Sequence, residues 1–260
     1  MKLQVLVSAV GREPEELISR MKLSSDAIIV NQGQTHGFQK MTLDGYEIRF
    51  YDFMEKGVGL SRNTALLRAD GDILLFSDED ITYDEGYADK ILSEFEKHPE
   101  ADMLLFNMRV GASRATYHIE KFGRVRWYNS GRYPTYSFAV RREKLHRNNI
   151  TFSLLFGGGA KYSNGEDSLF LKDCLKAGLK IYCVPVEIGE EAERESSWFT
   201  GYHEKFFFDR GVLYHYLYGG MAGVFALRFI LTKKGVMCRE ILPKQAFQLM
   251  KRGIREGKRR

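Results

Sequence analysis

Residues 71–80 have the sequence Gly-Asp-Ile-Leu-Leu-Phe-Ser-Asp-Glu-Asp, a short apolar run followed closely by three acidic residues. The four apolar residues from Ile73 to Phe76 are typical of a strand that is buried on both faces of a sheet. Acidic side chains that follow such a strand lie at its carboxyl end, where open α/β sheets bind their ligands. This stretch therefore predicts both a parallel sheet and a ligand site at one edge of it.

Similar apolar runs bounded by polar turns occur on both sides of this stretch. The other runs that we expect to form strands are 3–10, 27–30, 46–53, 103–106, 136–141 and 180–184, the last ending at Pro185. Helical patterns fall between several of them, at 14–21, 60–68, 84–98 and 167–177. This alternation predicts an α/β fold with a mainly parallel sheet covered by helices on both faces.

The composition fits one large domain, or a domain with a small appendage. The chain has 260 residues, 44% of them hydrophobic, so it can bury a substantial core. Its 39 Lys and Arg against 34 Asp and Glu give a net charge of +5, too small to indicate a nucleic-acid partner. Three cysteines without a paired metal-binding spacing favour a reducing compartment. The start lacks a cleavable signal pattern, so we expect residues 3–10 to be a buried strand.

Beyond residue 200 the composition changes, and we expect a first domain at 1–200 and a helical, aromatic and basic extension at 201–260. Residues 212–231 are apolar, but a histidine, an arginine and three glycines make them a poor transmembrane span and favour an interfacial or core helix. Residues 244–260 contain seven basic side chains against Glu256 alone. This amphipathic tail either contacts an anionic membrane or packs on the first domain as a lid with a solvated basic face.

The acidic residues 78–80 have two interpretations. Asp78 and Asp80 can bring carboxylate oxygens to one hard cation, which usually keeps open positions for substrate phosphates. The alternative is a solvated acidic turn that caps the helix expected from residue 84. The position directly after a buried strand weakens the capping interpretation, and both interpretations stay open.

Two further motifs contain residues that suit the chemistry of a site. Glu166 and Asp167 open an apolar helix after a glycine-rich loop, where a carboxylate can act as a general base or simply interact favourably with the helix dipole. Residues 56–63, Lys-Gly-Val-Gly-Leu-Ser-Arg-Asn, combine glycines that permit close backbone approach with Arg62, whose fork of donors suits a phosphate or a base edge. An ordinary glycine turn before a helix is the alternative.

Taken in order, five stretches resemble the motifs of family 2 glycosyltransferases. They are Leu-Val-Ser-Ala-Val at 6–10, Ile-Ile-Val-Asn-Gln-Gly at 28–33, Gly-Leu-Ser-Arg-Asn at 59–63, the stretch at 71–80, and Asn-Gly-Glu-Asp-Ser-Leu-Phe-Leu at 164–171. The resemblance covers roughly residues 1–200. It implies a GT-A fold, a divalent cation (Mg²⁺ or Mn²⁺), and inversion at the anomeric carbon by a single displacement.

The resemblance also implies roles for single residues. Asp78 and Asp80 resemble the aspartates of the family's D-x-D motif, with Asp80 the better candidate for direct metal contact. Asp167 resembles the catalytic base, with Glu166 as its neighbour. The positions that resemble nucleotide-contacting ones are Ala9, Asn31, Arg62, Asp78 and Glu79, and Trp198 is similar to an acceptor-side residue.

Two positions depart from the family's pattern. Asn31-Gln32 replaces an acidic pair that often precedes the glycine after the second strand, which leaves the identity of the nucleotide base open. Residues 186–195 contain no histidine where many relatives have one, so a metal or phosphate ligand is either missing or replaced by His203.

These expectations describe a hexosyltransferase-type enzyme. It would transfer a sugar from a UDP-sugar to a hydroxyl of a glycan or lipid-linked acceptor in capsular, exopolysaccharide or lipopolysaccharide synthesis. It would be cytoplasmic, at the inner face of the plasma membrane. One alternative is an inactive relative that binds a nucleotide-sugar or a glycan. Another is a sugar nucleotidyltransferase, which the single glycine within residues 8–14 disfavours.

Overall fold

The computed structural model describes residues 1–111, 117–192 and 201–259. Its strands are β1 (Leu3–Val10), β2 (Asp26–Gln32), β3 (Gly37–Leu43), β4 (Tyr46–Phe53), β5 (Ile73–Asp78), β6 (Ile81–Tyr83), β7 (Met103–Arg109), β8 (Gly123–Arg124), β9 (Phe138–Arg141) and β10 (Ile181–Glu191). Its helices are α1 (Pro14–Met21), α2 (Val58–Arg68), α3 (Tyr87–Lys97), α4 (Arg142–Arg147), α5 (Glu166–Lys176), α6 (Glu204–Tyr218), α7 (Ala222–Met237) and α8 (Pro243–Lys258). Short 3-10 turns at Thr135–Ser137 and Gly219–Met221 complete the described elements.

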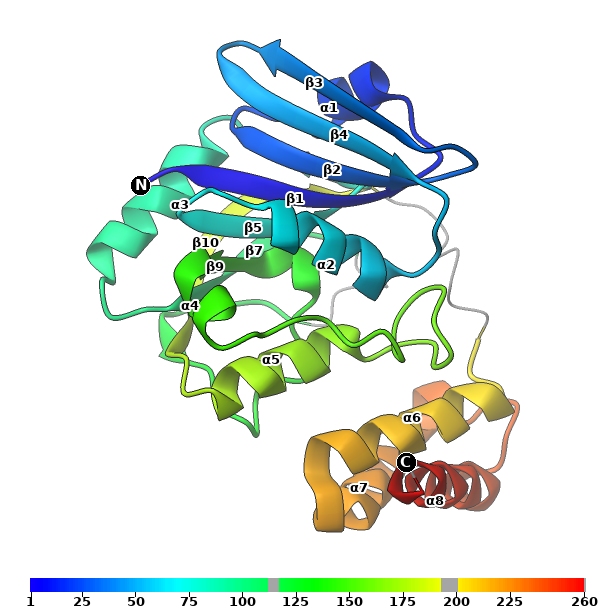
Figure 1. The fold of residues 1–260 in the computed structure, drawn as a ribbon. Coiled ribbons are helices and arrows are strands. Elements are labelled where there is room, and N and C mark those ends of the chain that lie inside the picture. The colour runs from blue at the N-terminus through cyan, green and yellow to red at the C-terminus, as the bar shows by residue number, and fades with distance from the viewer. Residues whose placement is uncertain (112–116, 193–200, 260) are drawn as a thin grey trace.

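The strands form one ten-stranded sheet in the order β3-β4-β2-β1-β5-β9-β7-β10-β6, with β8 paired to β10 off this path (Figure 1). The strands β4, β2, β1, β5, β7 and β10 run in one direction, because β9 is antiparallel to both of its neighbours, β5 and β7. One face of the sheet is packed by α1 and α3, and the other by α2, α4 and α5. The predicted α/β fold with a mainly parallel, helix-covered sheet is confirmed.

Several strands differ from the sequence-based prediction, which also omits the short strands β6 and β8. The sequence does not predict β3, because nearly all of its side chains are exposed and it lacks an apolar pattern. The expected end of the last strand at Pro185 is wrong, since β10 continues to Glu191. Its pairing with β7 shifts register between Cys183 and Glu187, and such an irregular ladder tolerates a residue without a backbone N–H.

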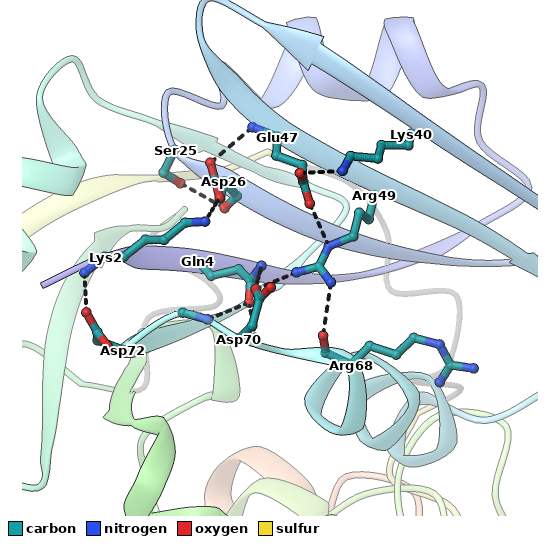
Figure 2. A network of polar contacts seen from close by, with 11 residues as sticks. Lys2, Gln4, Ser25, Asp26, Lys40, Glu47, Arg49, Arg68, Asp70 and Asp72 are labelled. Carbon is teal, nitrogen blue, oxygen red and sulfur yellow. Dashed lines mark hydrogen bonds and ion pairs between the residues drawn. The ribbon is translucent and has the colours of Figure 1, made fainter.

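A polar network joins the amino-terminal ends of the central strands (Figure 2). Gln4 on β1 donates to Asp70 Oδ1 at 2.9 Å and accepts from the backbone N–H groups of Asp70 and Gly71 at 3.0 and 3.1 Å. Arg49 on β4 pairs with the same Asp70 carboxylate. Burial disfavours the charge on Asp70, but the Gln4 hydrogen bond and Arg49 outweigh burial and lower its pKa. These polar groups satisfy one another, so this edge of the sheet is a structural support.

The three C-terminal helices have a hydrophobic core of their own. Helices α6 and α8 approach so closely that a Cβ on Gly211 or Gly253 would collide with the backbone of the facing helix. Leu249, Met250 and Ile254 of α8 are buried in this core. Of the two interpretations of the tail, the structure favours packing on protein, because the apolar face of α8 packs against α6.

The apolar stretch at 212–231 forms parts of two helices. Gly219, with a φ of 54°, and the 3-10 turn that it opens separate α6 from α7. Val212 and Leu213 of α6 pack with Phe156 and Leu169 of the first domain, and so attach the extension to the sheet domain. Within the described residues, no helix is long and apolar enough to cross a membrane. We propose the predicted division into a domain at 1–200 and an extension at 201–260.

Candidate active site

The acidic turn after β5 lies at the carboxyl edge of the sheet, opposite the Gln4 network. β5 ends at Asp78, and the turn at Glu79 and Asp80 leads into the short strand β6. Helix α3 begins later than predicted, at Tyr87, with Gly86 at its N-cap and no side-chain cap. The alternative that the acidic residues cap this helix is therefore wrong.

Arg62 connects the two acidic motifs. Its side chain is only 5% exposed, and its Nη2 donates to Asp78 Oδ1 at 2.8 Å while its Nη1 donates to Glu166 Oε1 at 3.0 Å. The ring of Phe152 lies 5.4 Å from the guanidinium carbon. Burial alone would lower the pKa of Arg62, but the charges of Asp78 and Glu166 outweigh burial and raise it. Three motifs that are separate in the sequence thus form one charged cluster.

Glycines let the loops before α2 and α5 approach each other. The N–H of Val58 donates to the carbonyl of Gly158 at 2.9 Å. Gly157 has a φ of 104°, and a Cβ there would lie 2.9 Å from the carboxyl carbon of Glu166. Gln32, at the end of β2, hydrogen-bonds both the carbonyl and the N–H of Gly57, at 3.0 and 3.3 Å. The two glycine-rich segments therefore form one support for the Arg62 cluster.

Asp167 lies in the first turn of α5, beside Glu166. Burial, and then the charge of Glu166, raise its pKa to about 6. The N–H of Ser168 and the charges of Arg62 and Arg210 lower the pKa but do not outweigh these two effects. The Ser168 N–H donates to Asp167 Oδ1 at 2.6 Å. Arg210 belongs to α6, so the C-terminal extension contributes to the electrostatics of this carboxyl group. A carboxylate with this pKa is mostly ionised at neutral pH and binds a proton more readily than an ordinary aspartate, which suits a general base.

Three of the predicted nucleotide contacts lie at the same edge but are buried. Ala9 packs in the core, and Asn31 donates to the carbonyl of Arg12 at 3.0 Å and to Asp52 Oδ1 at 2.7 Å. Glu79 binds the Arg12 guanidinium through two hydrogen bonds of 2.9 Å. The sequence analysis does not identify Arg12 as a site residue. Its position just after the first strand is the only feature of the sequence that could have indicated it. Asn31 and Glu79 thus hydrogen-bond other parts of the protein, and direct contacts of Ala9, Asn31 and Glu79 with a nucleotide stay predictions.

Asp78 and Asp80 are the candidate ligands of a divalent cation. The side chain of Asp78 is 30% exposed, although one of its oxygens pairs with Arg62. The described residues contain no cluster of three or more His, Cys, Asp or Glu that could hold a metal ion by themselves. Mg²⁺ is commonly held by one or two carboxylates together with water and substrate phosphates, and the pair fits that mode of binding. Trp198 lies outside the described residues, and His203 is the N-cap of α6.

Replacing Arg62 tests whether the cluster holds the site together. We expect Arg62→Met to lower the free energy of unfolding by about 3 kcal/mol, because it leaves two partly buried carboxylates without their cation. Arg68→Met, at an exposed position of the same helix, is the control, and urea unfolding measures both. A loss below about 1 kcal/mol for Arg62→Met, as for an exposed ion pair, would contradict this account.

Comparisons with known proteins bear on the family and on the fold. The sequence profile described as glycosyl transferase family 2 matches residues 15–156, more than half of the chain. A comparison with curated protein sequences gives no match.

Among solved structures, S. aureus TarS in complex with UDP-GlcNAc has a TM-score of 0.64 and 16% identity, over 92% of this chain and 74% of that chain. The mannosyltransferase PcManGT from Pyrobaculum calidifontis, in complex with GDP-Man and Mn²⁺, has a TM-score of 0.53 and 14% identity, over 99% of this chain and 75% of that chain. These likenesses confirm the predicted GT-A fold. With the profile match over residues 15–156, they lead to one conclusion: the chain belongs to glycosyl transferase family 2.

Proposed function

We propose that the protein is an inverting, cation-dependent glycosyltransferase that transfers a sugar from a UDP-sugar to a hydroxyl of a glycan or lipid-linked acceptor in surface-polysaccharide synthesis. The observation that carries the proposal is the Arg62 bridge from Asp78 to Glu166. It brings the carboxylates expected on the donor side next to Asp167, the expected base on the acceptor side. The nucleotide-sugars held by TarS and PcManGT support a donor of that class here.

The reaction follows from the places of these groups. Asp167 accepts the proton of the acceptor hydroxyl, whose oxygen attacks the anomeric carbon while the bond to the diphosphate breaks on the opposite face. Burial, and then the charge of Glu166, keep the pKa of Asp167 high, and Arg62 positions Glu166 and Asp78. Asp78 and Asp80 would hold the cation, which when bound offsets the charge of the departing diphosphate.

Both alternative functions are less well supported. An inactive binding relative would be expected to have lost one of the acidic motifs, but both are present and joined through Arg62. A sugar nucleotidyltransferase needs a basic, glycine-rich loop after the first strand that is open to phosphates. Here Arg12, the cation of that segment, is paired with Glu79.

We further propose that the protein contacts the cytoplasmic face of the plasma membrane through α7 instead of the tail. Three of its apolar side chains, Val224, Leu227 and Leu231, are 66%, 46% and 59% exposed. The helix contains Arg228, Lys233 and Lys234 but no acidic residue. Exposed apolar side chains among basic ones suit the interface of an anionic bilayer.

Donor binding tests the enzyme class. We expect one nucleotide-sugar to bind in the presence of Mn²⁺, and Asp80→Ala to weaken that binding at least about tenfold, because a carboxylate ligand of the cation is lost. Calorimetry over a panel of donors, with and without chelator, measures this, and Asp89→Ala on the exposed side of α3 is the control. Failure of the native chain to bind any donor would favour the inactive relative.

The base assignment predicts opposite effects on activity and stability. Asp167→Asn should lower turnover by about 10²–10⁴-fold without weakening donor binding, since the hydroxyl loses its proton acceptor. The native rate should fall as the pH drops through about 6, where Asp167 becomes protonated.

Stability changes with pH in the other direction. Because folding raises the pKa of Asp167, ionisation of this group destabilises the fold, and the destabilisation is fully present above about pH 6. It fades as the pH falls toward 3.8, the ordinary pKa of an aspartate. Asp167→Asn should therefore melt at a higher temperature than the native chain at neutral pH, and the difference should shrink in acid. Unchanged turnover in this variant would show that Asp167 is not the base.

Membrane contact is tested with vesicles. We expect the native chain to sediment with vesicles rich in anionic lipid, and Leu227→Glu/Leu231→Glu to sediment markedly less, because charge replaces the apolar stripe of α7. The control is Lys251→Glu on α8, whose apolar face is buried in the protein. An equal loss in the control would show that net charge, and not α7, governs binding.

A further inference from the structure

A cleft of about 620 Å³ lies between α5 and the C-terminal extension. Its walls are the segment 124–131, one side of α5, the end of α6 and the start of α7. The cleft begins at Ser168, next to the proposed base Asp167, and continues past Lys176 at the end of α5. At 1.5 Å per helical residue, it follows α5 for about 12 Å, which is longer than one sugar ring.

Aromatic side chains form one wall of the cleft. Trp127 and Tyr128 are 60% and 64% exposed, and their rings meet edge to face at 5.7 Å. Phe225 of α7 contacts Trp127 edge to face and stacks on Tyr218 of α6 at 4.0 Å. Large exposed aromatic rings in a concave site are typical of ligand surfaces, and they offer flat apolar faces on which sugar rings can pack.

The lining of the cleft is cationic. It contains Arg124, Arg126, Lys172 and Lys176 and no aspartate or glutamate. The Arg124 guanidinium is held over the ring of Tyr182 at 4.7 Å, and Lys172 donates to the carbonyl of Tyr216. In the part of the chain that the structure describes, Arg126 and Lys176 form no ion pair and are exposed. Concave cationic surfaces of this kind raise the local concentration of anionic ligands.

We propose that this cleft binds the acceptor as an anionic glycan chain. Sugar rings pack on Trp127 and Tyr128, and the phosphate or uronate groups of the chain lie against Arg126 and Lys176. The inference rests on the proposed transferase function, because it places the reactive end of the chain at Asp167. It gives the acceptor a binding surface made jointly by the sheet domain and the extension.

The test measures binding of hexagalacturonate, an anionic sugar chain, and of maltohexaose, a neutral one, by calorimetry with the full chain. Two cleft variants are compared with the native chain. Arg126→Ala/Lys176→Ala removes the two exposed charges, and Trp127→Ala removes the main aromatic ring. Lys251→Ala/Arg252→Ala on α8 and Phe38→Ala on β3 are the matched controls, because Lys251 and Arg252 are exposed and Phe38 is 56% exposed, all away from the cleft. Melting temperatures check that all variants are folded.

We expect hexagalacturonate to bind the native chain and both controls equally, and each cleft variant at least about tenfold more weakly. Binding should weaken as salt rises from about 0.05 to about 0.3 M, and maltohexaose should bind less tightly throughout. Donor hydrolysis without acceptor should be unchanged in the cleft variants.

Three results would overturn the assignment: no binding of hexagalacturonate to the native chain, equal binding to native and cleft variants, or equal affinity for the neutral chain. Failure of the transferase function gives a different pattern. In that case no donor is hydrolysed by the native chain, while hexagalacturonate binding still depends on Trp127, Arg126 and Lys176.

Discussion

A buried arginine with two carboxylate partners is the constraint on which the proposed site depends. Arg62 can remain charged in the interior only while Asp78 and Glu166 stay beside it, because an uncompensated buried charge costs several kcal/mol. This requirement brings α2, the end of β5 and the start of α5 to one point, although Glu166 lies 104 residues after Arg62. The glycines at 57, 157 and 159 allow the loops before α2 and α5 to approach each other closely enough for these contacts.

The sequence predicts the centre of the fold better than its margins, for a physical reason. Strands such as β5 are buried on both faces, and their continuous apolar runs are visible in the sequence. β3 is held to β4 mainly by backbone pairing, and its exposed side chains carry no such pattern. A proline normally ends a strand in a regular sheet, so Pro185 predicts the end of β10. The pairing of β10 with β7 is irregular at that position, however, and this irregularity cannot be seen in the sequence of β10 alone.

The same distinction applies to the site. Local motifs and family resemblance identify Arg62, both acidic motifs and the glycine-rich loops, but no local pattern shows that Arg62 bonds to both motifs. Arg210 was missed because it comes from a helix far along the chain, whose position depends on tertiary packing. The amphipathic tail illustrates a related limit, because an apolar stripe shows that α8 is covered without showing whether protein or lipid covers it.

The contact between Gly165 and α6 has a consequence for how such enzymes diversify. Leu213 occupies the space beside Gly165 where a Cβ would fit in other loops, and Arg210, one turn earlier on α6, acts on the adjacent Asp167. The helices after residue 200 are therefore not an interchangeable module. A chimera that takes these helices from another family member would alter the pKa of Asp167, the proposed base, along with any change in acceptor preference. Substitutions on α6 and in residues 165–167 should accordingly be inherited together.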